Sequence, residues 1–328
     1  MKKFLLKSAL YIFLILLLLE GIVRMLHLYT EDPPRFIDDY GVEKRVPDHT
    51  GYAVTGNRNQ NFSEFHINKA GFNSHREFAP SSDKYEVALV GDSFIEGFHQ
   101  DYNSSIAVRI EQKLPDIEVY KYGYAGYDFA NQMHLVHAYK KDFELIDEII
   151  LYLNYENDLD RGVYEPNYDR IKMLSSRLFK LRDNIKLLAY GSKIGIVEPL
   201  KKLAQGGDAF EDTQDAYKNN TLNGETDDEK RKKDEKRIAN FKSLIALYGL
   251  DKDKTAILLD SRKTSTRFLD FLKENGIRYI DFAQRFEKSD TSTNLVYDHH
   301  WNAHGRELIS EEIAHFFYAL CQTVRKNK

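Results

Sequence analysis

The chain has 328 residues, enough for one large domain or two modest ones, and its 42% hydrophobic and 30% charged content is typical of a globular protein. A formal net charge of −4 excludes a large basic surface for nucleic acid. The single cysteine, Cys321, excludes an internal disulfide and a cysteine-rich zinc site.

Residues 1–28 predict a transmembrane anchor. Three lysines within the first seven residues precede a continuous apolar run at 8–19, and residues 4–28 reach the length of about 20 residues that a spanning helix needs. The lysines favour a cytoplasmic N-terminus, which places everything after the helix outside, in the periplasm or at the surface of a bacterial cell. A cleaved signal peptide is the alternative, but no small-x-small site follows the run, which favours an uncleaved anchor.

Residues 29–84 are rich in Pro, Asp, Asn and Gly and have no sustained period. They predict a juxtamembrane connector of loops and short strands that packs on the main domain. Within it, residues 66–73 have the pattern of a strand that leads into a turn, where Gly71 supplies unusual backbone angles.

From residue 85 onward, short apolar runs alternate with helical spacing. We expect strands at 85–90, 117–121, 148–153, 254–259 and 277–280, and helices from Ser104 or Ser105, at 129–139, at 267–274 and at 302–319. Nearly continuous apolar strands separated by helices indicate a parallel sheet covered on both faces. Residues 85–328 are therefore expected to form one α/β domain.

An insertion at 161–250 separates the third and fourth strands. Its first half has apolar residues at helical spacing, its middle at 206–226 is polar, and a charged run at 227–237 enters another helix. Such an insertion is either a lid or substrate platform over the sheet edge or a set of solvated helices, and the charged run favours a solvated face.

Polar residues follow several of these strands. Ser93 comes after the first strand in Gly91-Asp92-Ser93, Gly123 after the second, Asn157 after the third, and His300 with Asp298 after the fifth. Because the carboxyl ends of parallel strands meet at one edge, we expect these groups to converge there. A hydroxyl, an imidazole, a carboxylate and hydrogen-bond donors are the parts that serine acyl transfer requires.

These segments resemble the four blocks of the SGNH (GDSL-type) hydrolase superfamily. The blocks are Gly91 to Gly97, Gly123 to Gly126, Asn157-Asp158 and Asp298-x-His300-x-Asn302-x-x-Gly305, in the order of that family. The resemblance covers residues 85–328 without the insertion. It implies a flavodoxin-like three-layer α/β/α sandwich and ester hydrolysis or acyl transfer.

The resemblance also implies a role for each residue. Ser93 is the nucleophile, His300 and Asp298 are the base and its acid, and the N–H groups of Ser93 and Gly123 with the Asn157 side chain form the oxyanion hole. Two positions depart from the usual pattern. Lys121 stands where family members often have Asn, and the acid lies two residues before the histidine instead of three, as in some superfamily enzymes that act on secreted polysaccharides.

Other roles for these residues stay open. Ser93 could be a helix N-cap. Asp92 is expected to brace the turn or to lie at the pocket, and Trp301 either lines the pocket or wedges the loop that carries His300. His300 and His304 have the spacing of a metal pair on a helix, but no glutamate follows His300, so neither a metal nor a cofactor is predicted.

The sequence thus predicts a membrane-anchored extracytoplasmic serine esterase, similar to carbohydrate esterases and deacetylases, that acts on small acyl esters of a cell-surface glycan. One alternative is an O-acyltransferase that modifies a polysaccharide with the same triad and a multispanning acyltransferase as partner. A second alternative is a non-catalytic glycan-binding protein on the same fold.

Overall fold

The computed structural model describes residues 1–56, 61–81, 84–196 and 226–326. Residues 206–225 of the predicted polar segment lie outside the described residues. The side chain of Cys321 lies outside them as well. The central sheet has five parallel strands in the order β6-β5-β7-β8-β9: β5 (Tyr85–Gly91), β6 (Ile117–Gly123), β7 (Glu148–Tyr152), β8 (Thr255–Leu259) and β9 (Arg278–Asp281). When these five strands are numbered in chain order, their order across the sheet is 2-1-3-4-5, which is the flavodoxin-like order. The predicted fold class is confirmed.

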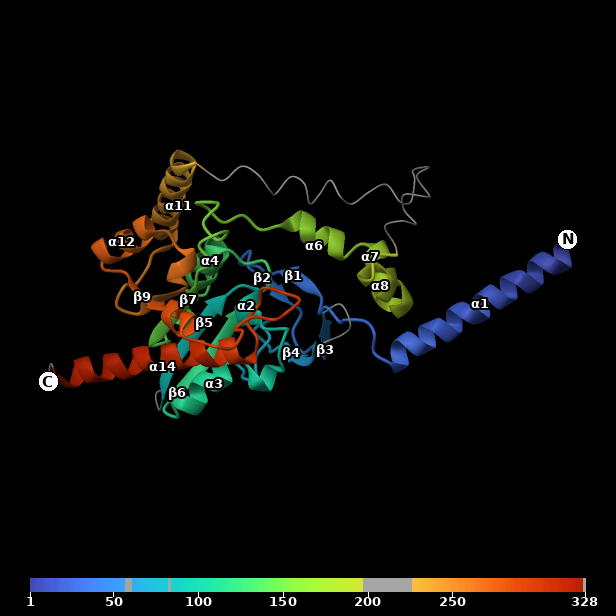
Figure 1. Ribbon diagram of the computed structural model, residues 1–328, viewed down its shortest axis with the longest axis horizontal. Coiled ribbons are helices and arrows are strands. Elements are labelled where there is room, and N and C mark those ends of the chain that lie inside the picture. Colours follow the sequence, from blue (N-terminus) through green and yellow to red (C-terminus); the bar gives the residue numbers. More distant parts are fainter. Residues whose placement is uncertain (57–60, 82–83, 197–225, 327–328) are drawn as a thin grey trace.

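Helices cover both faces of the sheet (Figure 1). One face packs on α4 (Phe129–Ala138), α11 (Asp227–Tyr248) and α12 (Thr266–Glu274), and its core includes Phe129, Phe241 and Phe268. The other face packs on α3 (Ile106–Lys113), α13 (Ala283–Glu287) and α14 (Ala303–Lys326). Burial on both faces explains why the strands read as unbroken apolar runs.

The helices begin where capping residues allow it. Asp128 and Asn131 form a capping box at the start of α4, and Thr226 and Glu229 form one at the start of α11. The charged run at 227–237 lies in the first half of α11 and is mostly exposed, as its solvated-face interpretation predicts. Four further short elements are α2 (Ser93–Glu96), α5 (Lys140–Phe143) and the 3₁₀ turns Tyr102–Ser104 and Ser261–Lys263.

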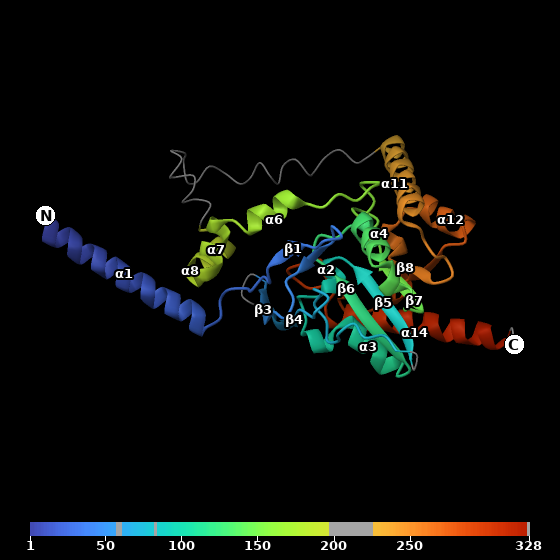
Figure 2. The ribbon, with the colours of Figure 1, turned by 180° about the vertical axis from the view of Figure 1, so that it is seen from behind.

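The connector forms two small antiparallel ribbons. β1 (Arg35–Ile37) pairs with β2 (Glu43–Arg45), and β3 (Thr50–Thr55) pairs with β4 (Asn61–His66). The chain leaves β4 through a turn at Gly71, whose φ of +89° favours glycine. Figure 2 shows the ribbons between the main sheet and the N-terminal helix.

The N-terminal helix α1 (Lys2–Met25) extends away from the rest of the molecule (Figures 1 and 2). Of its residues only Val23 is buried. By length and composition it could cross a membrane, although a signal sequence would pass the same test.

The first half of the insertion is not one helix. It breaks into α6 (Tyr168–Leu174), α7 (Arg177–Asn184) and α8 (Lys186–Lys193), with interruptions at Ser175-Ser176 and at Ile185. The apolar residues of these three helices do not enter either core of the sheet, and Leu178, Leu181 and Leu188 are exposed. Of these helices α8 lies beside the C-terminal end of α1, α7 packs on α8, and α6 packs on β1 (Figures 1 and 2).

Candidate active site

The turn after β5 places Ser93 at the carboxyl edge of the sheet. Asp92, and not Ser93, is the N-cap of α2, because its Oδ1 accepts the Phe94 N–H at 2.8 Å. Gly97 ends this four-residue helix in the left-handed conformation, with φ of 70°. Ser93 is therefore the first residue of the helix and keeps a half-exposed hydroxyl that no cap occupies.

Ser93, His300 and Asp298 form one chain of hydrogen bonds. His300 Nε2 lies 2.7 Å from Ser93 Oγ, and His300 Nδ1 lies 2.5 Å from Asp298 Oδ1. Asp298 Oδ1 also accepts the His300 backbone N–H at 3.0 Å, which fixes the carboxylate against the ring. With Nδ1 protonated toward Asp298, Nε2 is left free to accept the serine proton.

Aromatic rings hold the His300 imidazole on both sides. The His99 ring stacks at 4.2 Å between centroids, and the Phe94 ring lies at 4.5 Å. His99 Nε2 also lies 3.3 Å from Asp298 Oδ2, on the oxygen that His300 does not use. The sequence reasoning missed His99, although a histidine six residues after the candidate nucleophile was a visible signal.

The loop that carries His300 is fixed by the residues after it. Asn302 Nδ2 donates to the carbonyls of Ser292 and Asn294 at 2.6 and 3.1 Å, and its Oδ1 accepts the Gly305 N–H at 2.9 Å. A Cβ on Gly305 would meet the Thr293 carbonyl oxygen at 2.2 Å. The pattern Asp-x-His-x-Asn-x-x-Gly is thus a packing requirement as well as a chemical one.

Burial and neighbouring charges tune the acids and bases of the site. Burial acts to raise the pKa of Asp298, but the hydrogen bonds from His300 outweigh it, and the pKa of Asp298 is lowered. Burial, together with the nearby His300, lowers the pKa of His99 to about 4. At neutral pH His99 is therefore an uncharged neighbour of Asp298, and Asp298 stays ionised.

The predicted oxyanion donors differ in their placement. The Ser93 N–H is in the first turn of α2, where it has no intrahelical acceptor. Tyr124 N–H donates to the Gly91 carbonyl at 3.1 Å, so the alternation of a parallel ladder turns the Gly123 N–H away from β5. The Asn157 side chain is exposed and makes no hydrogen bond to any described residue. Among the described residues, Asn157 and Ser93 are thus not joined by a hydrogen bond.

Gly123 has a packing role of its own. A Cβ there would lie 2.0 Å from the Glu96 backbone nitrogen, so only glycine lets β6 and α2 approach this closely.

A buried polar network holds α2 in place, and the sequence reasoning missed it. Glu96 Oε1 accepts Arg45 Nε at 2.9 Å, and Glu96 Oε2 accepts the Ala125 N–H at 3.0 Å. The Glu96 carbonyl accepts the Asn73 amide at 2.8 Å and Lys121 Nζ at 3.1 Å. Lys121, which departs from the family pattern, thus satisfies a free carbonyl at the end of α2.

Three further predicted residues serve the surroundings of the site. Asp92 is buried and caps α2, and burial raises its pKa to about 7. Trp301 is buried at 4.8 Å from Phe94 and lines a separate cavity of about 400 Å³, so it wedges the loop and does not line the pocket at Ser93. His304 Nε2 lies 2.8 Å from Ser289 Oγ.

His99, Asp298 and His300 could also be considered as metal ligands, because their nitrogen and oxygen atoms lie within 4.8 Å of one another. The hydrogen bonds, the ion pair and the ring stacking among these three residues account for this proximity.

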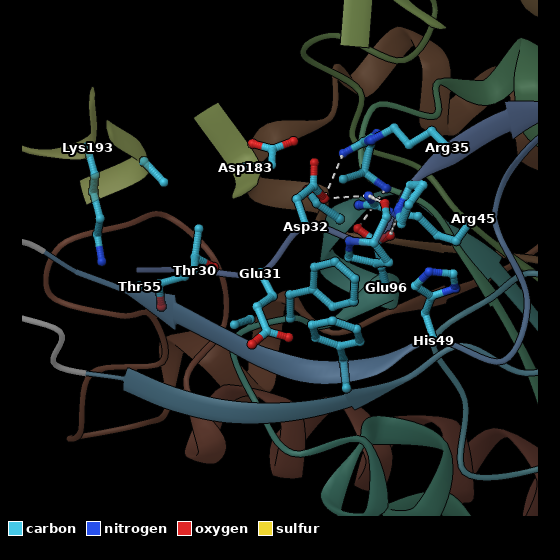
Figure 3. A pocket seen from close by; sticks show the side chains of 18 of the residues that line it. Thr30, Glu31, Asp32, Arg35, Arg45, His49, Thr55, Glu96, Asp183 and Lys193 are labelled. Atoms are coloured by element: carbon cyan, nitrogen blue, oxygen red, sulfur yellow. Dashed lines mark hydrogen bonds and ion pairs between the residues drawn. The ribbon is translucent and has the colours of Figure 1, made fainter. Parts of the chain in front are cut away.

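Ser93 and His300 open into a cavity of about 860 Å³. One of its walls comes from the connector, with Thr30, Glu31 and Arg35, and another from α7 and α8, with Asp183 and Lys193. Figure 3 shows Lys193 and Asp183 across from Thr30 and Glu31, with the Arg35, Arg45 and Glu96 cluster farther along the cavity. This volume is in the range of small-molecule sites.

No protein-family model and no curated relative matches the chain. Among solved structures it is similar to a lipolytic protein of the G-D-S-L family from Veillonella parvula, with 12% identity, 71% of this chain and 98% of that chain covered, and a TM-score of 0.36. It is similar to a lipase/acylhydrolase from Enterococcus faecalis, with 11% identity, 70% and 93% covered, and a TM-score of 0.38. It is also similar to a psychrotrophic esterase from Pseudoalteromonas sp., with 10% identity, 73% and 100% covered, and a TM-score of 0.38. The fold assignment stands on the strand order of the sheet and not on these likenesses.

We expect Glu96→Gln to destabilise the protein by about 3–5 kcal/mol, because it leaves the buried Arg45 guanidinium without its closest buried counter-charge. Urea unfolding of the full chain in detergent measures this. Glu235→Gln is the matched control, since its pair with Arg267 is half exposed and is worth at most about 1 kcal/mol. Equal stability of the two variants would contradict the role given to Glu96.

The lowered pKa of His99 predicts a loss of stability in mild acid. The unfolded chain binds a proton near pH 6.5, whereas the folded chain binds it only near pH 4, so the contribution is complete above about pH 6.5 and is lost as the pH falls toward 4. His99→Phe keeps an aromatic ring against His300 and removes this titration. Unfolding midpoints at pH 7.5 and 4.5 should therefore differ less in the variant, and an unchanged difference would refute the assignment.

Proposed function

We propose that this protein is a membrane-anchored serine esterase that hydrolyses small acyl esters through an acyl-enzyme on Ser93. The observation that carries the proposal is the unbroken hydrogen-bond chain from Ser93 through His300 to Asp298. In it, Ser93 Oγ attacks the ester carbonyl and passes its proton to His300 Nε2. The resulting imidazolium is stabilised by Asp298, whose lowered pKa keeps it ionised.

The same groups complete the reaction. When the tetrahedral intermediate collapses, the C–O bond to the alcohol breaks and His300 Nε2 returns its proton to the leaving oxygen. Water then attacks the acyl-enzyme, gives a proton to His300 Nε2, and releases the acid as Ser93 recovers its proton. The developing oxyanion would be bound by the Ser93 N–H and by Asn157 after its exposed side chain turns inward. The Gly123 N–H, which points away from β5, would have to reorient to join them.

The substrate class follows from the cavity and from α1. We infer an O-acylated glycan at the cell surface, because the cavity combines charged side chains such as Arg35 and Lys193 with the partly exposed ring of Phe98. A ring of this kind can stack on a sugar face. The lysines in the first two turns of α1 favour a cytoplasmic N-terminus, which would put the site outside the cell.

A contact between α1 and α8 supports an uncleaved anchor. Glu20 accepts the backbone N–H groups of Lys186 and Leu187 at 3.0 and 2.7 Å, and so satisfies two free donors at the start of α8. Removal of residues 1–28 as a signal peptide would take this acceptor away.

The central test is labelling of the full chain with a fluorophosphonate probe, followed by mapping of the modified residue and by acetate release from acetylated glycans. We expect Ser93 to be labelled and Ser93→Ala to abolish both signals, with a loss of roughly 10⁴-fold in kcat for Asp298→Asn. Ser104→Ala, at an exposed serine nearby, should behave as the unmodified protein. Absence of labelling at Ser93 would contradict the proposed esterase activity and leave the non-catalytic glycan-binding alternative.

The acyltransferase alternative differs only in the alcohol that attacks the acyl-enzyme. The two are separated with a glycan donor that carries labelled acetyl groups, incubated together with an unacetylated glycan. An esterase releases labelled acetate, whereas a transferase moves the label to the added glycan.

The contribution of Asn157 can be tested separately. As an oxyanion donor it should lose about 10²–10³-fold in kcat on mutation to Ala, with little change in KM. Asn103→Ala is the control, because that side chain is also exposed. If Asn157→Ala and Asn103→Ala have equal kcat values, Asn157 is not a donor.

A further inference from the structure

The start of helix α8 is hydrogen-bonded to one position along α1, at Glu20 and Arg24. Besides the two hydrogen bonds to Glu20, Arg24 donates to the Asn184 carbonyl at 2.7 Å, and Arg24 and Glu20 form an ion pair at 2.7 Å. Glu20 directly follows the apolar run that ends at Leu19. With residues 4–19 in the hydrocarbon and Lys7 reaching back to the interface, Glu20 and the start of α8 are at the boundary between hydrocarbon and headgroups.

The helices next to this contact expose apolar side chains. Leu178 is 78% exposed, Leu181 50% and Leu188 42%, and Ile194 and Ile196 farther along the chain are 46% and 53% exposed. Leu178 and Leu181 are three residues apart and share a face of α7, whereas Leu188 lies on α8 and Ile194 and Ile196 follow the end of α8. No described residue covers the exposed parts of these side chains, so burying them takes a partner outside the described part of the chain.

The charge of the same segment favours one kind of partner. Residues 168–196 contain seven Lys or Arg residues and two acidic ones, in a chain whose overall charge is −4. Lys172, Arg177 and Lys180 are exposed. Exposed apolar residues together with exposed cations are the composition of helices that lie in the interface of an anionic membrane.

We propose that α7 and α8 form a platform that lies on an anionic membrane surface beside α1. The proposal rests on α1 as the membrane anchor under the proposed function. Opposite parts of the same two helices line the cavity at Ser93 through Asp183, Lys186 and Lys193. The platform thus places the entrance of the cavity at the headgroup level, where an ester carried by a membrane-bound glycan or lipid would reach it.

Fluorescence of the full chain in vesicles tests the platform. In a Cys321→Ser background, a single cysteine at Leu178 (Leu178→Cys) carries an environment-sensitive NBD label, and the vesicles contain phosphatidylglycerol with nitroxide-labelled lipid. We expect a blue-shifted emission and about twofold or stronger quenching by shallow nitroxides, as for a side chain in the interface. Quenching should weaken in phosphatidylcholine vesicles, because the cations lose their partner.

Two control labels make the outcome readable. Leu247→Cys, 52% exposed on α11 and far from α1 in both views, should show no quenching (Figures 1 and 2). Phe13→Cys reports on the anchor and should be quenched by deep nitroxides. A quenched Phe13 label with a Leu178 label as accessible to water as that at Leu247 would overturn the platform and leave the anchor intact. Shielding of the Leu178 label without nitroxide quenching would indicate a protein partner and would also overturn it.

Discussion

The position of the candidate nucleophile depends on one buried carboxylate, that of Glu96. Helix α2 has only four residues, far fewer than a helix needs to be stable by itself. Glu96 joins it to the connector through Arg45 and to the turn after β6 through the Ala125 N–H, while its carbonyl receives Asn73 and Lys121. Because a buried charge is tolerated only when it is paired, burial of the Glu96 carboxylate depends on Arg45 of the connector. The connector is therefore part of the unit that positions Ser93.

Much of the fold could be predicted because a parallel sheet imposes a simple rule on its sequence. Strands buried on both faces must be mostly apolar, and the apolar runs of β5, β7 and β8 are so nearly continuous that the sequence predicts them as strands. The same topology sends all carboxyl ends to one edge, so Ser93 and His300 could be placed together although 207 residues separate them.

Contacts between side chains from separate segments could not be predicted in this way. The stacking of His99 on His300 depends on how two loops fold over each other, and a helical period at 171–188 marks an apolar face without saying what covers it. In this chain that face avoids the sheet, and the pair Ser175-Ser176 together with Ile185 divides the segment into short helices. The motif Asn157-Asp158 likewise gave the turn but not the direction of the exposed Asn157 side chain.

The walls of the large cavity have a consequence for how such a protein can change. The groups that would break bonds stand on the sheet edge, whereas the surfaces that would choose a ligand come from the connector and from an insertion between β7 and β8. Loops tolerate sequence change better than the strands they join. Of these two walls only the insertion is separable from the candidate site, because the connector also carries Arg45, the partner of Glu96. Exchanging residues 168–196 is therefore expected to alter one wall of the cavity while Ser93, His300 and Asp298 keep their positions.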